Sequence, residues 1–271
     1  MASITRQGLA RIETAFTSAL EKRSAALMPY FTLGYPSISE SIEIIKAIAP
    51  YCDLIELGVP FSDPIADGPI IQRSTQAALE NGVTTAKCLE MVELLRASGV
   101  SLPLLLMGYY NPIMAYGEAT FIQDSAQSGV DGFIVPDLPP EESDELYALA
   151  KDESLALIQF LAPTSNEKRI QLIMKKANGF LYMVSLTGVT GSRAMAAADL
   201  KELVHTIKER SGLPVAVGFG IGDGIQAAEF GQFADGVIIG SALIDAVNRA
   251  VDKPHAAAQM IESISQALEL T

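Results

Sequence analysis

The sequence is poor in histidine and cysteine, with two of each among 271 residues. His205 and His255 fall in stretches expected to be helical, Cys52 precedes an expected strand, and Cys88 falls in an expected helix. Two isolated cysteines can form neither a disulfide framework nor a CxxC motif. A zinc site needs clustered histidine and cysteine ligands, so we expect no metal site.

Positive charge is also scarce. The chain has 19 Lys and Arg against 32 Asp and Glu, a formal net charge of −13, and it contains no basic run. A chain of this charge repels a phosphate backbone, which argues against nucleic acid and anionic membranes as partners. An anionic ligand would therefore have to be held by local backbone N–H groups.

Long apolar runs are absent as well. None approaches the roughly 18 residues of a membrane span, and the first residues lack the apolar core and small-residue cleavage site of a signal peptide. We therefore expect no membrane association and a cytoplasmic location. The chain is nevertheless 49 % hydrophobic, which is enough apolar material for a large core.

The sequence does contain a repeated alternation of short apolar runs with amphipathic stretches. The runs do not alternate polar and apolar residues, which is typical of parallel strands covered on both faces. The eight runs are Leu27–Thr32, Leu54–Leu57, Leu102–Met107, Gly132–Val135, Leu155–Leu161, Phe180–Val184, Pro214–Val217 and Val237–Ile239.

The stretches between these runs have helical spacing. One further stretch, Gly8–Lys22, precedes the first run and has its large apolar residues four apart. Ser39 and Asn166 are residue types that cap helices, and we expect them to begin two of these elements. The other expected helices are Ser39–Ala49, Thr85–Ser98, Glu141–Lys151, Asn166–Ala177, Leu200–Arg210 and Ala242–Val247.

Eight strand–helix units without a linker or a low-complexity stretch predict one α/β domain over residues 1–271. The expected fold is a (β/α)₈ TIM barrel with an extra N-terminal helix. A doubly wound sheet is the alternative, but it usually has a Gly-rich turn after its first strand, where this chain has Leu33-Gly34-Tyr35-Pro36. In a barrel the active site lies at the carboxyl ends of the strands.

Two carboxylates stand at the end of the second expected strand. Glu56 interrupts an otherwise apolar strand, and Asp67 follows in the same proline-rich loop. A lone Glu in a strand often only tilts toward solvent or pairs with a base. Burial, however, raises the pKa of a carboxyl group toward the range useful for proton transfer. Two acids in different environments can divide acid and base roles within one site.

Three later strand ends carry glycine-rich turns. They are Thr187–Gly191, Gly218–Gly222 and the pair Gly240-Ser241, which opens an expected helix. Glycine lets the backbone approach an anion, and a helix N-terminus offers it free N–H groups. Loops after strands seven and eight are the common phosphate site of this fold. Tight turns that simply need glycine are the alternative explanation.

Absent residue types narrow the chemistry further. No lysine stands at an expected strand end, so a Schiff-base mechanism lacks its nucleophile. Neither cysteine stands at a strand end, which argues against a thiol nucleophile. Acid–base catalysis by carboxylates is the chemistry that these residues favour.

The segment from Glu56 to Pro69, ELGVPFSDPIADGP, resembles the signature of the tryptophan synthase α subunit family. The resemblance runs in family order from about residue 27 to residue 245. Its further blocks are Leu106–Pro112, Val135–Pro139, Gly188–Gly191, Gly218–Ile221 and Gly240-Ser241.

The resemblance implies a lyase that cleaves indole-3-glycerol phosphate to indole and glyceraldehyde 3-phosphate by a retro-aldol reaction, in tryptophan biosynthesis. Glu56 matches the family's general acid–base. Asp67 matches the carboxylate that hydrogen-bonds the indole N–H and stabilises the cationic ring. Thr190 matches the residue of a mobile loop that closes against Asp67, and closure would exclude water from the site.

Other positions carry over from the matching motifs as substrate contacts. Tyr30 stands where phenylalanine is common in the family, and a buried phenol there needs a hydrogen-bond partner. The implied walls of the indole pocket are Tyr30, Met107, Tyr109, Ile134, Phe160, Tyr182, Phe219 and Ile238. The implied phosphate contacts are Gly191, Gly220, Gly240 and Ser241.

The resemblance also implies a partner and no cofactor in this chain. Family members dock onto a β subunit that carries pyridoxal phosphate, in an α2β2 heterotetramer. The matching docking loops are Pro60–Pro64 and Asn111–Tyr116, whose apolar and proline content suits a buried interface. Asp63 is expected to contact or signal to the partner.

Two other hypotheses compete with the lyase. One is another phosphate-binding barrel, such as indole-glycerol-phosphate synthase or phosphoribosylanthranilate isomerase. The first would need lysines and the second a cysteine at the strand ends, and this sequence has neither. The other is a binding module that has lost catalysis, against which the intact Glu56–Pro69 signature argues.

Overall fold

Eight parallel strands pair in sequence order and close into a barrel, because β8 pairs with β1 through Met28 and Ile238. The computed structural model describes residues 7–22, 25–184, 197–218 and 220–269. The strands are β1 (Ala26–Thr32), β2 (Ile55–Gly58), β3 (Leu104–Met107), β4 (Gly132–Ile134), β5 (Ala156–Leu161), β6 (Leu181–Val184), β7 (Val215–Gly218) and β8 (Gly236–Ile239).

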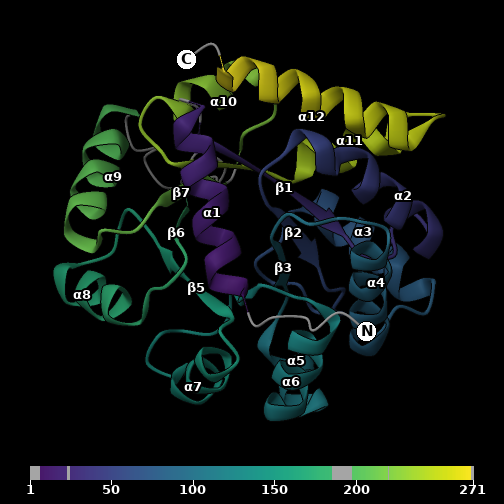
Figure 1. Cartoon of the computed structure of the whole chain (residues 1–271), viewed down its shortest axis with the longest axis horizontal. Coiled ribbons are helices and arrows are strands. Elements are labelled where there is room, and N and C mark those ends of the chain that lie inside the picture. Colours follow the sequence, from purple (N-terminus) through teal and green to yellow (C-terminus); the bar gives the residue numbers. More distant parts are fainter. Residues whose placement is uncertain (1–6, 23–24, 185–196, 219, 270–271) are drawn as a thin grey trace.

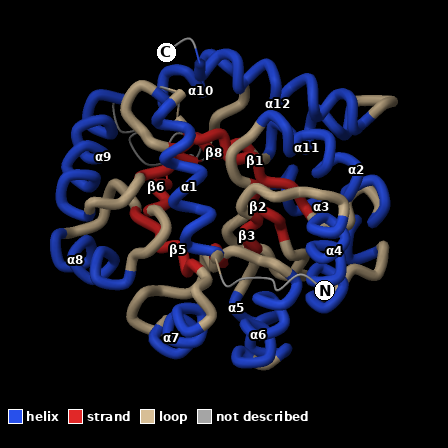
Figure 2. Tube along the Cα trace, in the orientation of Figure 1, coloured by secondary structure: helices blue, strands red, loops and turns tan. Residues whose placement is uncertain are grey.

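Helices surround this barrel as an outer ring (Figures 1 and 2). The C-terminal helix α12 packs on α2, α10 and α11, over the part of the ring where β8 meets β1. The helices are α1 (Gly8–Glu21), α2 (Ile38–Ile48), α3 (Pro69–Glu80), α4 (Thr85–Ala97), α5 (Tyr110–Tyr116), α6 (Glu118–Ser128), α7 (Asp144–Asp152), α8 (Glu167–Lys176), α9 (Ala197–Ser211), α10 (Gly224–Gly231), α11 (Ser241–Arg249) and α12 (Lys253–Glu269), with a short 3-10 helix, η1 (Ala49–Tyr51).

The predicted barrel and its extra N-terminal helix are confirmed, and each predicted strand overlaps an observed one. Asn166 caps α8, since its side chain accepts the Arg169 N–H at 3.0 Å. The prediction for Ser39 was wrong. Ser37 has extended backbone and its side chain accepts the Glu40 N–H, so α2 begins at Ile38 and Ser39 lies in its first turn.

Helix α1 covers the amino end of the barrel. Its buried Ile12 and Phe16 belong to the same apolar cluster as inward-facing barrel residues such as Met28 and Leu105. Figure 1 shows α1 crossing the face of the barrel in this view. Because this helix packs against the interior side chains at the amino end, we expect a ligand of the barrel interior to enter at the carboxyl ends of the strands.

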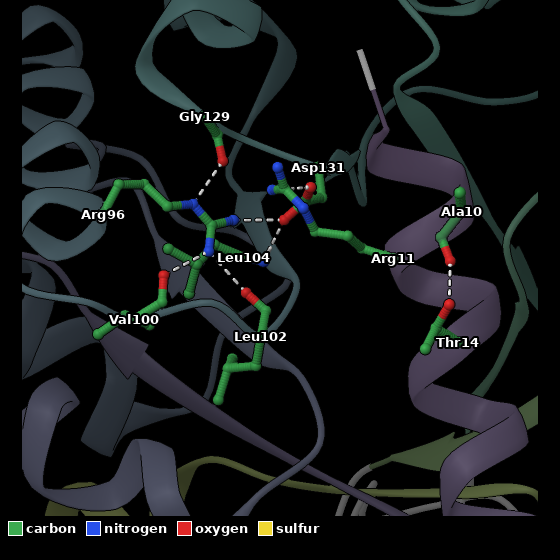
Figure 3. A network of polar contacts seen from close by, with 9 residues as sticks. All are labelled: Ala10, Arg11, Thr14, Arg96, Val100, Leu102, Leu104, Gly129 and Asp131. Carbon is green, nitrogen blue, oxygen red and sulfur yellow. Dashed lines mark hydrogen bonds and ion pairs between the residues drawn. The ribbon is translucent and has the colours of Figure 1, made fainter. Parts of the chain in front are cut away.

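A buried ion network fixes α1 to the barrel (Figure 3). The Asp131 carboxylate is 1 % exposed and accepts bonds from Arg11 at 2.8 Å, from Arg96 at 2.5 Å and from the Leu104 N–H at 2.9 Å. Arg96 on α4 also donates to the carbonyls of Gly129, Val100 and Leu102. The network therefore joins α1, α4 and the turns that lead into β3 and β4.

None of the helices that the structure describes is both long and apolar enough to cross a membrane. The described side chains also include no group of three or more His, Cys, Asp or Glu placed to hold a metal ion.

Candidate active site

A cavity of about 310 Å³ opens at the carboxyl ends of the strands, a volume that suits a small organic ligand. Its lining brings together residues of β1, β2, β3, β6 and β8 with the loops that follow β2, β7 and β8. The described lining residues are Tyr30, Glu56, Asp67, Gly68, Ile71, Met107, Tyr182, Gly220, Ile221, Gly222, Ile238, Gly240, Ser241 and Ala242.

A second hollow, of about 620 Å³, lies at the opposite end of the barrel beside α1. The charged groups in its described lining, Lys208 and Asp235, already pair with each other at 2.7 Å. Catalytic residues of such barrels stand at the carboxyl ends of strands, not at the amino ends. The smaller cavity is therefore the candidate active site.

Glu56 is placed in this cavity by β2. Its side chain is fully buried, and neither carboxyl oxygen has a hydrogen-bond partner among the described residues. Burial alone raises the pKa of Glu56 to about 8, because the charged form loses its hydration without gaining a partner. At neutral pH the group is therefore mostly protonated and can donate a proton.

Asp67 reaches the same cavity from the loop between β2 and α3 and is half-buried. The Tyr109 hydroxyl donates to Asp67 Oδ2 at 3.1 Å. Burial raises the pKa of Asp67, and the Tyr109 hydrogen bond opposes this rise because it stabilises the carboxylate. The two acids of the cavity thus differ, since among the described residues Asp67 has a donor for its charged form and Glu56 has none.

Two tyrosines form part of the cavity wall and lie over glycines of the neighbouring strands. Tyr30 on β1 is 6 % exposed and its hydroxyl lies 3.4 Å from Thr32 Oγ1. A Cβ at Gly58 would come within 2.1 Å of the Tyr30 hydroxyl, and one at Gly218 within 2.4 Å of the Tyr182 hydroxyl. These glycines leave room for the phenols, so both rings can occupy the barrel interior.

The other expected wall residues, together with the expected loop residue and one phosphate contact, divide into three groups. Met107 and Ile238 line the cavity directly. Tyr109, Ile134 and Phe160 are not among its described lining residues. Ile134 is fully buried in the barrel interior, and the Phe160 ring lies 4.7 Å from that of Tyr182, centroid to centroid. Thr190, Gly191 and Phe219 lie outside the described residues.

The side of the cavity formed by the turns after β7 and β8 is rich in backbone N–H groups. Gly220 has a φ of +83°, which a residue with a side chain rarely adopts. Helix α11 begins at Ser241 and has no side-chain cap, which leaves its first N–H groups free of such a partner. Gly240, Ser241 and Ala242 of this helix start line the cavity. No described lining residue is Lys or Arg. An anion here would be held by backbone dipoles.

Five cavity residues were not among those expected from the sequence. Ile221 and Gly222 stand within the glycine motif after β7, and Ala242 follows Ser241 in the first turn of α11, so the motifs did contain the signal. Gly68 and Ile71 belong to the start of α3. No helix was predicted there, because a proline-rich loop runs directly into it.

Comparison with known proteins agrees with this geometry. The model of the tryptophan synthase alpha chain family matches residues 16–270. The tryptophan synthase alpha chain of Chloroflexus aggregans is 50 % identical over 240 residues, which cover 88 % of this chain and 90 % of that protein. The tryptophan synthase of Saccharomyces cerevisiae is 44 % identical over 236 residues, which are 86 % of this chain but 33 % of that longer protein.

Solved structures show the same similarity. The tryptophan synthase subunit alpha from Legionella pneumophila superimposes with a TM-score of 0.90 at 36 % identity, covering 96 % of this chain and 99 % of that one. The chain therefore belongs to the tryptophan synthase alpha chain family and is a lyase that cleaves indole-3-glycerol phosphate to indole and glyceraldehyde 3-phosphate in tryptophan biosynthesis.

Proposed function

We propose that Glu56 is the general acid–base of this cleavage and that Asp67 holds the indole N–H. The observation that carries the proposal is the presence of both carboxyl groups in one cavity with different surroundings. A mostly protonated Glu56 can give a proton to indole C3, and Asp67 can stabilise the positive charge that then develops on the ring nitrogen.

The proton balance of the reaction allows one carboxyl group to act twice. Indole C3 gains a proton from Glu56, which makes the bond between C3 and the carbinol carbon cleavable. The electrons of that bond return to the ring as the carbinol hydroxyl becomes an aldehyde, and the hydroxyl proton passes to Glu56. Indole and glyceraldehyde 3-phosphate leave, and Glu56 is protonated again.

The phosphate belongs, in this proposal, on the turns after β7 and β8. Gly220, Gly240 and Ser241 line that side of the cavity, and the uncapped N-terminus of α11 supplies free N–H groups. This explains how a chain with a net charge of −13 binds an anion, since helix dipoles and backbone amides do not require Lys or Arg. Gly191 is the further phosphate contact and Thr190 the closing residue that the family resemblance implies.

Partner and cofactor are part of the same proposal. We infer that the chain assembles with a tryptophan synthase β subunit as an α2β2 heterotetramer, that pyridoxal phosphate belongs to the β subunit, and that the α chain itself uses no cofactor. Exposed apolar side chains near the expected docking loops support a covered surface: Ile65 is 84 % exposed and Met114 52 %. We further propose that residues 1–271 form one domain that works in the cytoplasm.

Indole release by the Glu56→Gln and Asp67→Asn variants, each with and without added β subunit, tests the two roles. We expect each variant to fold normally and to lose about 10²- to 10⁴-fold in kcat, the usual value of one proton transfer or preorganised charge contact. Glu43→Gln is the matched control, because Glu43 is an exposed residue of α2 that pairs with Lys46 on the same helix. Native turnover in either active-site variant would contradict its assigned role.

A further inference from the structure

The Tyr30 hydroxyl ends a chain of buried hydroxyl groups that connects β1 to α3. Tyr30 Oη lies 3.4 Å from Thr32 Oγ1, and Thr32 Oγ1 lies 2.7 Å from Ser74 Oγ on α3. Ser74 Oγ in turn lies 2.8 Å from the Ile71 carbonyl. Thr32 and Ser74 are at most 1 % exposed, so water does not compete for these bonds.

The direction of every bond in this chain follows from its last member. A carbonyl oxygen can only accept, so the Ser74 hydroxyl must donate to Ile71. Ser74 has no second hydrogen, and Thr32 must therefore donate to Ser74. By the same reasoning the Tyr30 hydroxyl donates to Thr32. The one hydrogen on Tyr30 Oη is thus directed toward Thr32 Oγ1.

A phenol hydroxyl that already donates its one hydrogen can take part in further hydrogen bonds only as an acceptor. Tyr30 lines the cavity, and no described residue donates to its oxygen. We infer that a lone pair of Tyr30 Oη is available to a ligand that carries an O–H or N–H donor. Phenylalanine at this position would leave the cavity the same shape and would remove the acceptor.

The Tyr30 ring lies between the two ends of the proposed substrate site. A Cβ at Gly240 would lie 3.3 Å from Tyr30 Cβ, which places the start of this side chain beside the proposed phosphate turn. Tyr30 is also the register partner of Glu56 on the adjacent strand, and its hydroxyl reaches the level of Gly58. The ring consequently flanks the path from the phosphate to the reacting carbon.

The substrate has one donor on this path that the proposed function does not use. The indole N–H goes to Asp67 and the hydroxyl on the reacting carbon goes to Glu56. The hydroxyl on the middle carbon of the glycerol chain, between the reacting carbon and the phosphate-bearing carbon, has no partner. We propose that Tyr30 Oη accepts the hydrogen bond of this middle hydroxyl and makes the enzyme selective for a hydroxylated chain, an inference that rests on the proposed function.

The reverse reaction, in which indole adds to the aldehyde, isolates this contact. The middle hydroxyl belongs to the aldehyde, so an aldehyde without it can be compared directly. Indole consumption is measured with glyceraldehyde 3-phosphate and with 3-oxopropyl phosphate, which lacks that hydroxyl. For Tyr30→Phe we expect kcat/KM to fall about three- to tenfold with glyceraldehyde 3-phosphate, the range of one neutral hydrogen bond. With 3-oxopropyl phosphate, kcat/KM of the Tyr30→Phe variant should equal that of the wild-type chain.

A second variant tests the direction of the chain. Thr32→Val removes the acceptor of the Tyr30 hydrogen bond, so the Tyr30 hydroxyl can rotate. The selectivity between the two aldehydes should therefore fall. In the Tyr30→Phe background the same substitution should leave the ratio of the two kcat/KM values unchanged. Tyr51→Phe is a matched control, because Tyr51 lies in η1, ahead of the amino end of β2.

Two results would overturn the inference. One is an equal change with both aldehydes in Tyr30→Phe, which would mean that the phenol only packs. The other is an unchanged ratio of the two kcat/KM values in a folded, active Thr32→Val variant that retains Tyr30. Glu56→Gln, assayed alongside, reports separately on the proposed function, because it should lower turnover of both aldehydes without changing their ratio.

Discussion

The Tyr109 hydroxyl joins the backbone and the side chain of the loop that carries Asp67. It accepts the Ala66 N–H at 2.9 Å and donates to Asp67 Oδ2 at 3.1 Å. Tyr109 stands just after β3, and the loop that it binds follows the neighbouring strand β2. The loop carboxylate is therefore positioned before any substrate arrives, which is the condition for effective electrostatic stabilisation.

Tyr109→Phe should weaken catalysis through Asp67. The variant loses the donor that stabilises the Asp67 carboxylate, so the pKa of Asp67 should rise and kcat/KM should fall about three- to tenfold near neutral pH. The pH profile of kcat/KM checks the cause, because its acidic limb should move to higher pH. An acidic limb that stays in place would mean that Tyr109 does not act through Asp67.

The alkaline limb of the same profile should belong to Glu56. Burial raises the pKa of this group to about 8, and the cleavage direction starts from the protonated acid. We expect kcat/KM of the wild-type chain to decline as pH rises through about 8. A profile that stays flat well beyond this pH would show that protonated Glu56 is not required.

Stability should respond to pH through the same residue. The pKa of Glu56 is higher in the folded chain, about 8 against 4.5 for a free glutamate, so the folded state binds more protons between these values. The free energy of unfolding therefore falls as pH rises from about 4.5 to about 8, and the loss is complete above that range.

Glu56→Gln should remove this loss. Chemical unfolding of the variant and the wild-type chain should give similar free energies near pH 5, and the variant should be more stable by roughly 2–5 kcal/mol near pH 8.5. The difference arises because the glutamine does not ionise in its buried site. Equal pH dependence of the two proteins would show that the glutamate does not titrate with a raised pKa.

Asp131→Asn should destabilise the fold without changing the chemistry. The substitution leaves Arg11 and Arg96 without their shared buried carboxylate, and breaking such a buried pair typically costs about 3–5 kcal/mol. Thermal and denaturant unfolding measure this loss, and KM should stay native at a temperature where the variant is folded. Arg249→Ala, which removes an exposed pair with Asp245, is the control and should have little effect.

Ile65→Asp should weaken assembly with the β subunit while sparing the isolated chain. Ile65 is 84 % exposed and stands in the loop that also carries Asp67, so a charge there would be buried unpaired at an interface. Sedimentation of the mixed subunits measures the loss of assembly, and indole release by the isolated variant is the control. Unchanged assembly would place the docking surface elsewhere.

The fold was predictable because each strand is buried on both faces and reads as a continuous apolar run. The predicted first and last residues of the strands were less accurate. Leu102 was placed in a strand but precedes β3, where its carbonyl binds Arg96, a tertiary contact that no local pattern reveals. The helix α3 was missed for a related reason, since its first residue is a proline that follows a loop rich in prolines.

The candidate site was partly predictable. Glu56 lies near the carboxyl end of β2, and the turns at Gly220 and Gly240 follow the ends of β7 and β8. The barrel must bring these strand ends to one face. The roles of Tyr109 and Thr32 were not predictable, because each depends on a hydrogen bond to a residue that is distant in sequence or on another element. Asp67 and Ser74 are 42 residues away from their partners Tyr109 and Thr32.

Exchange of the indole C3 hydrogen with solvent is the most direct test of Glu56, because it isolates the proton transfer from carbon–carbon cleavage. Indole in deuterium oxide, with the wild-type chain and inorganic phosphate but no aldehyde, should lose its C3 proton signal faster than in buffer alone. With Glu56→Gln the exchange should slow to the buffer rate. Exchange at the wild-type rate in a folded Glu56→Gln variant would contradict the account.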